Sequence, residues 1–406
     1  MYITGLIHRD RLFEVSTRWL ADRYRPGDGR FITELFIFEK LVSTPTGRRF
    51  LQDINRACHA GPFTTRRLQV KDDLRKAILA ATNLAGPRSK DLMERFRSTP
   101  EEYFPGTPAD LILTLSGGGE LQGMVRFKRI RRVAEKVSRR IADKLAGALQ
   151  SEMPSRPGGG GRRKLDGAEL SAEPGSPQAY LAEVERAVCQ RFRVGGIPFE
   201  PSDLRIDDLV GFKFVGDEED LERIERAIGE HPRARIAERE VHGGRYNDIN
   251  LLVDLDLPSP GEIIDGMRGW DWSQAAGRGL GSKTLLEDFP SYVESGARTF
   301  RTEVILTTFQ ELVESEFGHS IHEERILEQR RHAPYRGRIA QNAGFLMEYL
   351  LMLAISPTVE IASLPVKMWG RYLPDVYARA VWQLFGGEPN TSLFDAILLD
   401  PETSFP

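Results

Sequence analysis

The chain has 406 residues, of which 40% are hydrophobic and 28% charged, and its formal net charge is −3 at pH 7. This length predicts two or three domains, with enough apolar residues for real cores. The near-neutral charge excludes a protein whose whole surface is basic, as for bulk nucleic-acid binding, or acidic. The two cysteines, Cys58 and Cys189, lie far apart, which argues against a disulfide framework and fits a reducing compartment.

Hydropathy along the chain argues against a membrane protein. No run of about 18 apolar residues occurs, and the longest candidate, residues 344–355, is too short and contains Glu348. The first residues carry charge too early for the apolar core of a signal peptide. We therefore expect a cytoplasmic protein with no membrane partner.

Helical periodicity dominates both ends of the chain. We expect residues 1–118 to form a helical domain, because apolar residues recur three and four apart between Pro and Gly turns. Residues 331–406 follow a similar pattern and are expected to form a helical extension. Residues 119–330 alternate strand-like and helix-like segments. This order predicts an α+β protein, with a mixed sheet flanked by helical regions.

Residues 120–150 are predicted to form one long basic helix with a shared apolar face. Residues 151–178, rich in Gly, Pro, Ser and charge, are expected to be a flexible insertion. Strands are predicted at 208–215, 234–241, 245–255 and 301–308. A helix capped by Asp217 follows the first strand, a loop-rich stretch precedes the last, and a helix begins at Phe309.

The predicted basic helix carries cations suited to phosphate. Arg126, Lys128, Arg132 and Lys136 lie on neighbouring turns of such a helix. Arginine binds phosphate oxygens in pairs and lysine acts as a point charge, so these residues could hold a triphosphate. A solvated amphipathic helix, or one that contacts RNA or an acidic partner, explains the same pattern.

Two carboxylates stand at the start of predicted strands. Asp208 opens one apolar strand and Glu303 opens another. Mg²⁺ prefers carboxylate and phosphate oxygens, so the two residues could form a magnesium site. Aspartate is also a common turn residue at a strand entry, and Glu303 could be an exposed acid at the end of its strand.

Aromatic and imidazole side chains offer further candidates. Tyr246, at the head of a strand, could stack on a nucleobase or simply pack against the sheet. His319 and His322 lie three apart, a spacing that could bind zinc on a helix. No cysteine ligand or HExxH pattern accompanies them, so a phosphate-contacting or surface pair is the other interpretation.

The order and spacing of these motifs carry more information than any one of them. The pattern R-x-K followed by seven residues and K is matched by Arg126, Lys128 and Lys136, and D-[LIV]-x-G-x-[RK] by Asp208, Gly211 and Lys213. A strand with Tyr246, Asp248 and Asn250 then precedes Glu303 and the helical pattern of Glu316, Phe317, Gly318 and His322. Over residues 120–330 the chain resembles the synthetase domain of the RelA/SpoT family of nucleotide pyrophosphokinases.

This resemblance implies a nucleotidyltransferase-like fold and a specific chemistry. Family members transfer pyrophosphate from ATP to a ribose 3′ hydroxyl, of a guanine nucleotide, another nucleotide or a tRNA end. By resemblance, Asp208 and Glu303 would be catalytic and hold Mg²⁺. The ATP phosphates would be bound by Arg126, Lys128, Arg132 and Lys136. The acceptor would contact Tyr246, Asp248, Asn250, Lys213, His319 and His322.

The chain departs from the family pattern on the acceptor side. Asp248 and Asn250 stand where the family has Ser and His, and Ile305 and Thr307 where it has Gln and Arg. The pattern fits an enzyme with another acceptor. It also fits a catalytically degenerate nucleotide-binding or scaffold protein on the same fold. An RNA-binding module, using the basic helix and the Gly/Arg-rich segment 158–164, is a third interpretation, and the helical flanks could support a homo-oligomer.

Overall fold

The computed structural model describes residues 1–103, 106–152, 185–187, 189–196, 198–243, 247–273, 280–318, 338–370, 372 and 374–386. Almost all of the predicted flexible insertion at 151–178 lies outside these residues. Among the described helices, none combines the length and the apolar character needed to cross a membrane. Cys58 and Cys189 are both buried and unbridged.

Strands and helices alternate along the described chain. The strands are β1 (Tyr2–Ile3), β2 (Phe63–Val70), β3 (Pro108–Ser116), β4 (Leu121–Phe127), β5 (Arg205–Ile206), β6 (Val210–Val215), β7 (Ala234–His242), β8 (Asp248–Asp256) and β9 (Thr299–Thr307). The α-helices are α1 (Arg9–Leu20), α2 (Asp28–Cys58), α3 (Lys71–Ala80), α4 (Pro87–Ser98), α5 (Ile130–Glu152), α7 (Glu218–Glu230), α8 (Pro260–Gly266), α10 (Ser282–Ser295), α11 (Phe309–Phe317), α13 (Arg338–Met352) and α14 (Pro374–Leu384). Two 3₁₀ helices, η1 (Pro100–Tyr103) and η2 (Pro201–Leu204), complete the set.

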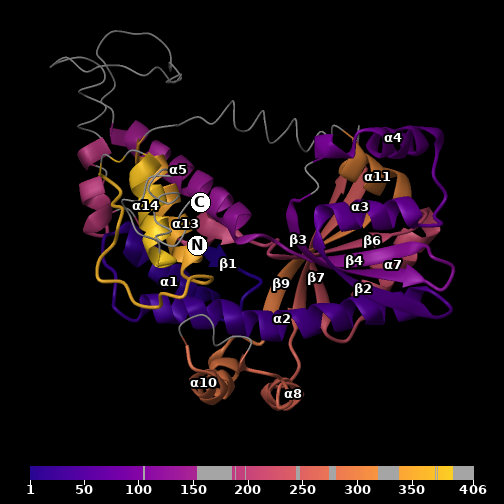
Figure 1. The fold of residues 1–406 in the computed structure, drawn as a ribbon, viewed down its shortest axis with the longest axis horizontal. Coiled ribbons are helices and arrows are strands. Elements are labelled where there is room, and N and C mark those ends of the chain that lie inside the picture. Colours follow the sequence, from indigo (N-terminus) through magenta and orange to yellow (C-terminus); the bar gives the residue numbers. More distant parts are fainter. Residues whose placement is uncertain are drawn as a thin grey trace, which may run out of the picture.

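A seven-stranded mixed sheet organises the molecule. Its strand order is β2-β3-β4-β6-β9-β8-β7, with β6 and β9 parallel and every other neighbouring pair antiparallel. The predicted mixed sheet with helices is therefore confirmed. Figure 1 shows the sheet on the right, the helices α1, α5, α13 and α14 on the left, and the long helix α2 running beneath both.

Helices cover the two faces of the sheet unequally. On one face α2 and α7 pack against inward-pointing residues such as Phe212 and Phe214 of β6. On the other face α3, α4 and α11 form a separate core with Leu111, Leu113 and Val215. This second core reaches β2, β3, β4 and the end of β6. Farther along the sheet, the same face carries polar side chains.

The prediction of one long helix over residues 120–150 is wrong in its first part. Residues 121–127 form β4, which pairs with β3 on one side and β6 on the other. Pairing on both edges satisfies the strand's backbone and buries Leu121–Val125, which outweighs the local helical periodicity. Helix α5 begins at Ile130. Its apolar residues do share one buried face, as predicted, and pack against α13.

Two other stretches also differ from prediction. Residues 1–118 are not wholly helical, because β2 and β3 form one end of the sheet. The segment 108–116 alternates apolar residues between the two cores, which is the signature of a strand. The stretch before β9, expected to be loop-rich, contains α8 and α10. The strand predictions around β6, β7, β8 and β9 and the Asp217 cap of α7 are confirmed.

A buried carboxylate ties three parts of the chain together. Glu39 of α2 accepts hydrogen bonds at Oε1 from the backbone N–H of Ile7 (2.6 Å), the N–H of His8 (3.3 Å) and the hydroxyl of Tyr292 in α10 (2.9 Å). Burial raises the pKa of Glu39 to about 7, although the hydrogen bonds lower it. The N-terminal segment and α10 are thus joined to α2 through one acidic side chain.

We predict that Glu39 makes the folded state less stable as pH rises. Because its pKa in the folded state exceeds the ordinary value of 4.5, its stabilising contribution is complete below about pH 4.5 and is lost as pH rises through about 7. The shift corresponds to on the order of 3 kcal/mol. Glu39→Gln keeps an acceptor oxygen, so its free energy of unfolding relative to wild type should rise between pH 5 and pH 8, measured by urea denaturation. A constant difference across this pH range would contradict the assignment.

A second prediction concerns the close approach of α2 to the segment after α13. A Cβ at Gly29 would overlap the carbonyl oxygen of Val359 and lie 3.1 Å from its carbonyl carbon. Both are backbone atoms, so Gly29→Ala should lower the free energy of unfolding by about 1–3 kcal/mol. Gly147→Ala, in α5 with no atom within 4 Å of the added Cβ, should instead stabilise by about 0.5–1 kcal/mol. Equal effects of the two substitutions would disprove the steric explanation.

Candidate functional site

Polar side chains occupy the sheet face beyond the α3–α4–α11 core. The strand register places Arg126 of β4, Gly211 of β6 and Glu303 of β9 in one row across the sheet. Among the described residues, a Cβ at Gly211 would meet only the Glu303 carbonyl oxygen, at 3.8 Å. Because glycine has no side chain, no described side chain fills the surface between Arg126 and Glu303 at this position. A ligand could approach the sheet backbone here.

Two lysines converge on one carboxylate beside this opening. Lys128, in the connection between β4 and α5, donates to Asp208 Oδ2, and Lys136 of α5 donates to the same oxygen. Glu303 is close enough to favour the charged forms of both lysines. Two of the predicted cations, Lys128 and Lys136, therefore meet the predicted carboxylate Asp208, whereas Arg126 comes from β4 and not from a shared helix.

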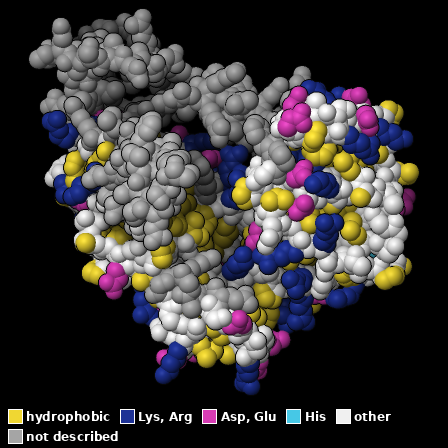
Figure 2. All heavy atoms as spheres, viewed as in Figure 1, with side chains coloured by type: hydrophobic (Ala, Val, Ile, Leu, Met, Phe, Trp, Pro, Cys, Tyr) yellow, Lys and Arg dark blue, Asp and Glu magenta, His cyan; other side chains and the backbone are white. Residues whose placement is uncertain are grey.

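Opposing effects act on the pKa values of the two lysines in this cluster. Burial, and then the cations Lys136 and Arg126, lower the pKa of Lys128. Direct contact with the Asp208 carboxylate opposes this shift and favours the ammonium form. Burial is also the main cause that lowers the pKa of Lys136. Figure 2 shows Lys and Arg side chains gathered along the furrow between the helical part and the sheet.

Oxygen atoms without partners lie in the same cluster. Asn250 of β8 donates from Nδ2 to Glu303 Oε1 at 3.1 Å. Among the described residues, the buried Asn250 Oδ1 and Asp208 Oδ1 have no hydrogen-bond partner. A buried polar atom without a partner is costly unless a ligand satisfies it.

This donor set fits a magnesium ion. Mg²⁺ is usually bound by one or two carboxylates together with waters and substrate phosphates. Asp208 and Glu303 supply the carboxylates, and Asn250 adds an amide oxygen. In the described part of the chain, no three His, Cys, Asp or Glu side chains gather as a metal-ligating group. A metal here would thus depend on phosphate oxygens for much of its coordination.

A second charged cluster lies next to the first. Lys213 of β6 is 3.4 Å from Ser315 Oγ of α11, and Lys71 of α3 pairs with Glu316 at 3.2 Å. Burial lowers the pKa of Lys213, and Glu316 opposes this shift. Burial alone would raise the pKa of Glu316, but Lys71, Lys213 and Arg126 together lower it below its usual value. These cations therefore favour the carboxylate form of Glu316 in this partly enclosed site.

The remaining predicted site residues are not part of the Asp208 cluster or lie outside the described residues. Arg132 pairs with Glu135 on its own helix at 2.7 Å and, among the described residues, forms no ion pair with Asp208. Asp248 is buried and contacts His242 of β7, with 2.7 Å between Oδ1 and Nδ1. Tyr246, His319 and His322 lie outside the described residues, and their predicted roles stay predictions.

Sequence patterns alone missed three residues of this region. Lys71 comes from the helical segment that was given no chemical role. Glu316 was noted only as part of a motif, and His242 was not singled out. The spacing of β7 and β8 as a hairpin is the signal that could have paired His242 with Asp248, since these residues are direct neighbours in the register.

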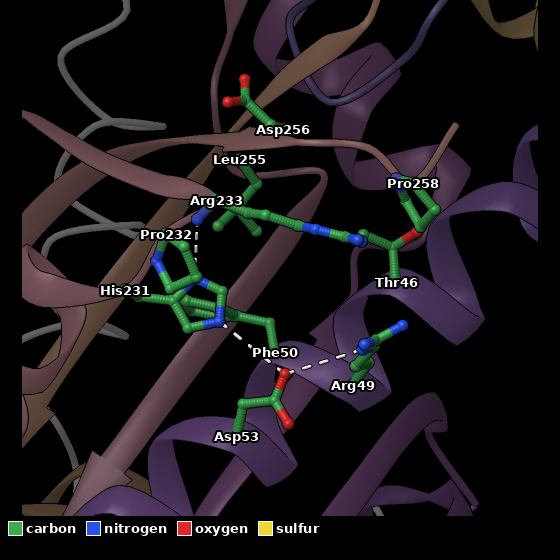
Figure 3. Close-up of a pocket in the computed structure, with 10 residues that line it drawn as sticks. All are labelled: Thr46, Arg49, Phe50, Asp53, His231, Pro232, Arg233, Leu255, Asp256 and Pro258. Carbon is green, nitrogen blue, oxygen red and sulfur yellow. Dashed lines mark hydrogen bonds and ion pairs between the residues drawn. The ribbon is translucent and has the colours of Figure 1, made fainter. Parts of the chain in front are cut away.

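A separate pocket lies on the other face of the sheet, which α2 covers. It is formed by α2, the turn before β7 and the end of β8 (Figure 3). Its lining residues are Thr46, Arg49, Phe50, Asp53, His231, Pro232, Arg233, Leu255, Asp256 and Pro258. Arg49 and His231 both approach Asp53 at 3.7 Å. Cations and carboxylates here largely compensate each other.

Comparison with known proteins adds no assignment. Searches against protein-family models and against curated proteins found no match for this chain. The resemblance to RelA/SpoT synthetases therefore stays a prediction. The structural basis for a function is the cluster around Gly211 and Asp208, which contains Arg126, Lys128, Lys136 and Glu303.

We predict that Asp208 competes with phosphate for the two lysines. In Asp208→Asn, Lys128 and Lys136 lose their carboxylate partner, so without metal the protein should bind inorganic tripolyphosphate more tightly. The gain should be on the order of 1 kcal/mol, or about fivefold, as for a partly exposed ion pair. Isothermal titration calorimetry in the presence of a chelator measures it. Asp203→Asn is the matched control, because Asp203 pairs with Lys144 farther along α5 (2.9 Å); equal gains in both variants would exclude a local site.

Proposed function

We propose that this protein catalyses ATP- and Mg²⁺-dependent pyrophosphoryl transfer to a hydroxyl of a nucleotide or of a tRNA end. The observation that carries the proposal is the meeting of two lysines with Asp208 and Glu303 at an open part of the sheet. Cations for a triphosphate and hard oxygen ligands for a metal are the parts that phosphoryl transfer requires. A nucleotidyltransferase-like fold is part of the same proposal.

Each residue of the cluster has a defined task in this reaction. Lys128 and Lys136 would exchange Asp208 for the phosphates of ATP, and Arg126 would contact them across Gly211. Asp208 and Glu303 would hold Mg²⁺, which neutralises phosphate charge when it is bound. Asn250 orients the Glu303 carboxylate through its hydrogen bond. Positioning and charge neutralisation supply most of the rate enhancement in such reactions.

An oxygen of the acceptor forms a bond to the β-phosphorus of ATP, and the bond from that phosphorus to the oxygen bridging the α- and β-phosphates breaks. AMP leaves with the bridging oxygen, and the acceptor carries the pyrophosphate. The proton of the acceptor hydroxyl must pass to a base.

One observation favours a different function, nucleotide binding without turnover. Asp208 is paired with two lysines and Glu303 with Asn250, so both carboxylates already have partners in the protein. A degenerate site that only binds nucleotide would keep such internal pairs. The predicted RNA-binding role depends on a segment outside the described residues, apart from the cations of α5.

The deciding experiment is a thin-layer assay with γ-labelled ATP and Mg²⁺. Acceptors should include GDP, GTP, adenine nucleotides and bulk tRNA. We expect a labelled acceptor product and an equal amount of AMP. Glu303→Gln should reduce the rate at least about 100-fold, because it removes a metal-binding charge from the transition state.

The control variant is Glu225→Gln. Glu225 pairs with Arg239 at 2.6 Å, and it belongs to α7, which packs on the opposite face of the sheet. Its activity should match that of wild type. No product with any acceptor, together with ATP binding measured by calorimetry, would replace the enzymatic proposal by the binding-only function.

A further inference from the structure

A histidine and a buried aspartate form a pair on the same polar face of the sheet. His242 Nδ1 lies 2.7 Å from Asp248 Oδ1. The Asp248 side chain is 5% exposed, whereas that of His242 is 48% exposed. The carboxylate therefore anchors the ring from the protein side, and the rest of the imidazole faces solvent.

This arrangement selects one tautomer of His242. A carboxylate accepts hydrogen bonds, so Nδ1 carries the proton that faces Asp248. In the neutral ring Nε2 is then an acceptor with a free lone pair. Among the described residues, the closest charged group to Nε2 is Glu240, at 3.6 Å, which is too long for a hydrogen bond. A buried acid that holds the imidazole in this way is the arrangement that prepares histidine to take a proton.

Another histidine shows the opposite arrangement. His231, in the pocket of Figure 3, accepts at Nδ1 from the backbone N–H of Arg233 (3.2 Å). Its proton is therefore on Nε2, which points to Asp53 at 3.7 Å. This ring has no acceptor nitrogen left for a substrate. The two histidines thus form a natural test pair on opposite faces of the sheet.

The His242 pair lies beside the proposed phosphate site. Asp248 and Asn250 are two residues apart on β8, so their side chains point to the same face. Asn250 contacts Glu303, and Asp248 is close enough to favour the charged form of Lys213. A hollow lined by Glu238, Glu240, Asn250 and Leu252 lies next to this row. An acceptor in this hollow would sit between His242 and the metal-binding carboxylates.

We propose that His242 is the general base that deprotonates the acceptor hydroxyl, and that Asp248 is the positioning residue that orients it. This inference rests on the proposed pyrophosphoryl transfer and names the base that this reaction needs. The acceptor hydroxyl donates its proton to Nε2 as its oxygen bonds to the β-phosphorus of ATP. AMP departs, and the imidazolium later releases the proton to solvent, so no further reactant is required.

The surroundings of His242 support a cationic intermediate. Asp248 faces the ring from β8 and Glu240 from β7 itself. Glu311 of α11 accepts a hydrogen bond from Asn247, the residue before Asp248, at 3.1 Å. Asp248 and Glu240, the two carboxylates that face the ring, stabilise the imidazolium formed during transfer. They also disfavour acceptor phosphates in this part of the site, so the hollow suits the hydroxyl-bearing sugar or a group that donates hydrogen bonds.

The test uses the full chain and whichever acceptor is active in the thin-layer assay. Initial rates are measured against pH for wild type, His242→Gln, Asp248→Asn and the control His231→Gln. We expect kcat to fall about 100-fold in His242→Gln with the KM for ATP unchanged. The wild-type rate should rise with pH, because only neutral imidazole can accept the proton, and this rise should be absent in His242→Gln. His231→Gln should behave as wild type.

Two further readouts separate catalysis from a structural role. Added imidazole should restore activity to His242→Ala but not to Glu303→Gln. In ¹⁵N-labelled protein, Asp248→Asn should change the tautomer of His242, seen in its ring nitrogen shifts, and lower kcat at least about tenfold.

The outcomes distinguish this proposal from the one on which it rests. Full activity of His242→Gln, or an unaltered pH profile, would overturn the role of His242 and leave pyrophosphoryl transfer intact. An inactive wild type with every acceptor would overturn both. Loss of activity in His242→Ala that imidazole cannot restore, with a changed KM for ATP, would make His242 a structural residue instead.

Discussion

The position of β6 between β4 and β9 is the constraint on which the candidate site depends. β6 pairs antiparallel with β4 and parallel with β9. This register places Arg126 on one side of Gly211 and Glu303 on the other. Asp208, just before β6, contacts both Lys128 and Lys136. Chain segments that are far apart in the sequence thus meet at one place on the sheet. The helices α2 and α7 stabilise the central strands of the sheet by packing on their apolar face.

Charge compensation explains how such a site can exist without ligand. Cations of this region pair with carboxylates, as in the pairs of Lys71 with Glu316 and of Lys136 with Asp208. An unpaired buried charge would be costly, and pairing removes most of that cost. A phosphate ligand and a metal can take the place of these internal partners, phosphate at the lysines and metal at the carboxylates. Binding would therefore exchange partners and would not require new charges to be buried.

The two sides of the site differ in character. The side nearest α5 is rich in Lys and Arg and suits a triphosphate. The side formed by β7 and β8 carries Glu240, Asp248 and His242 and is richer in acids. Such asymmetry is what a transferase needs when a polyanionic donor and a hydroxyl acceptor must bind next to each other. Within the proposed function, it also gives a physical meaning to Asp248 and Asn250.

Local sequence determined the strands around β6, β8 and β9, because their alternating apolar residues pack on a two-faced sheet. It also determined α7, whose Asp217 caps the first turn through the backbone N–H of Asp220. The start of α5 could not be derived in this way, since residues 121–127 are suited to a helix until strands on both sides pair with them. The site itself was only partly predictable. Its residue types were visible in the sequence, but the contact of Lys128 and Lys136 with Asp208, and of His242 with Asp248, arises from strand register, which only the tertiary structure decides.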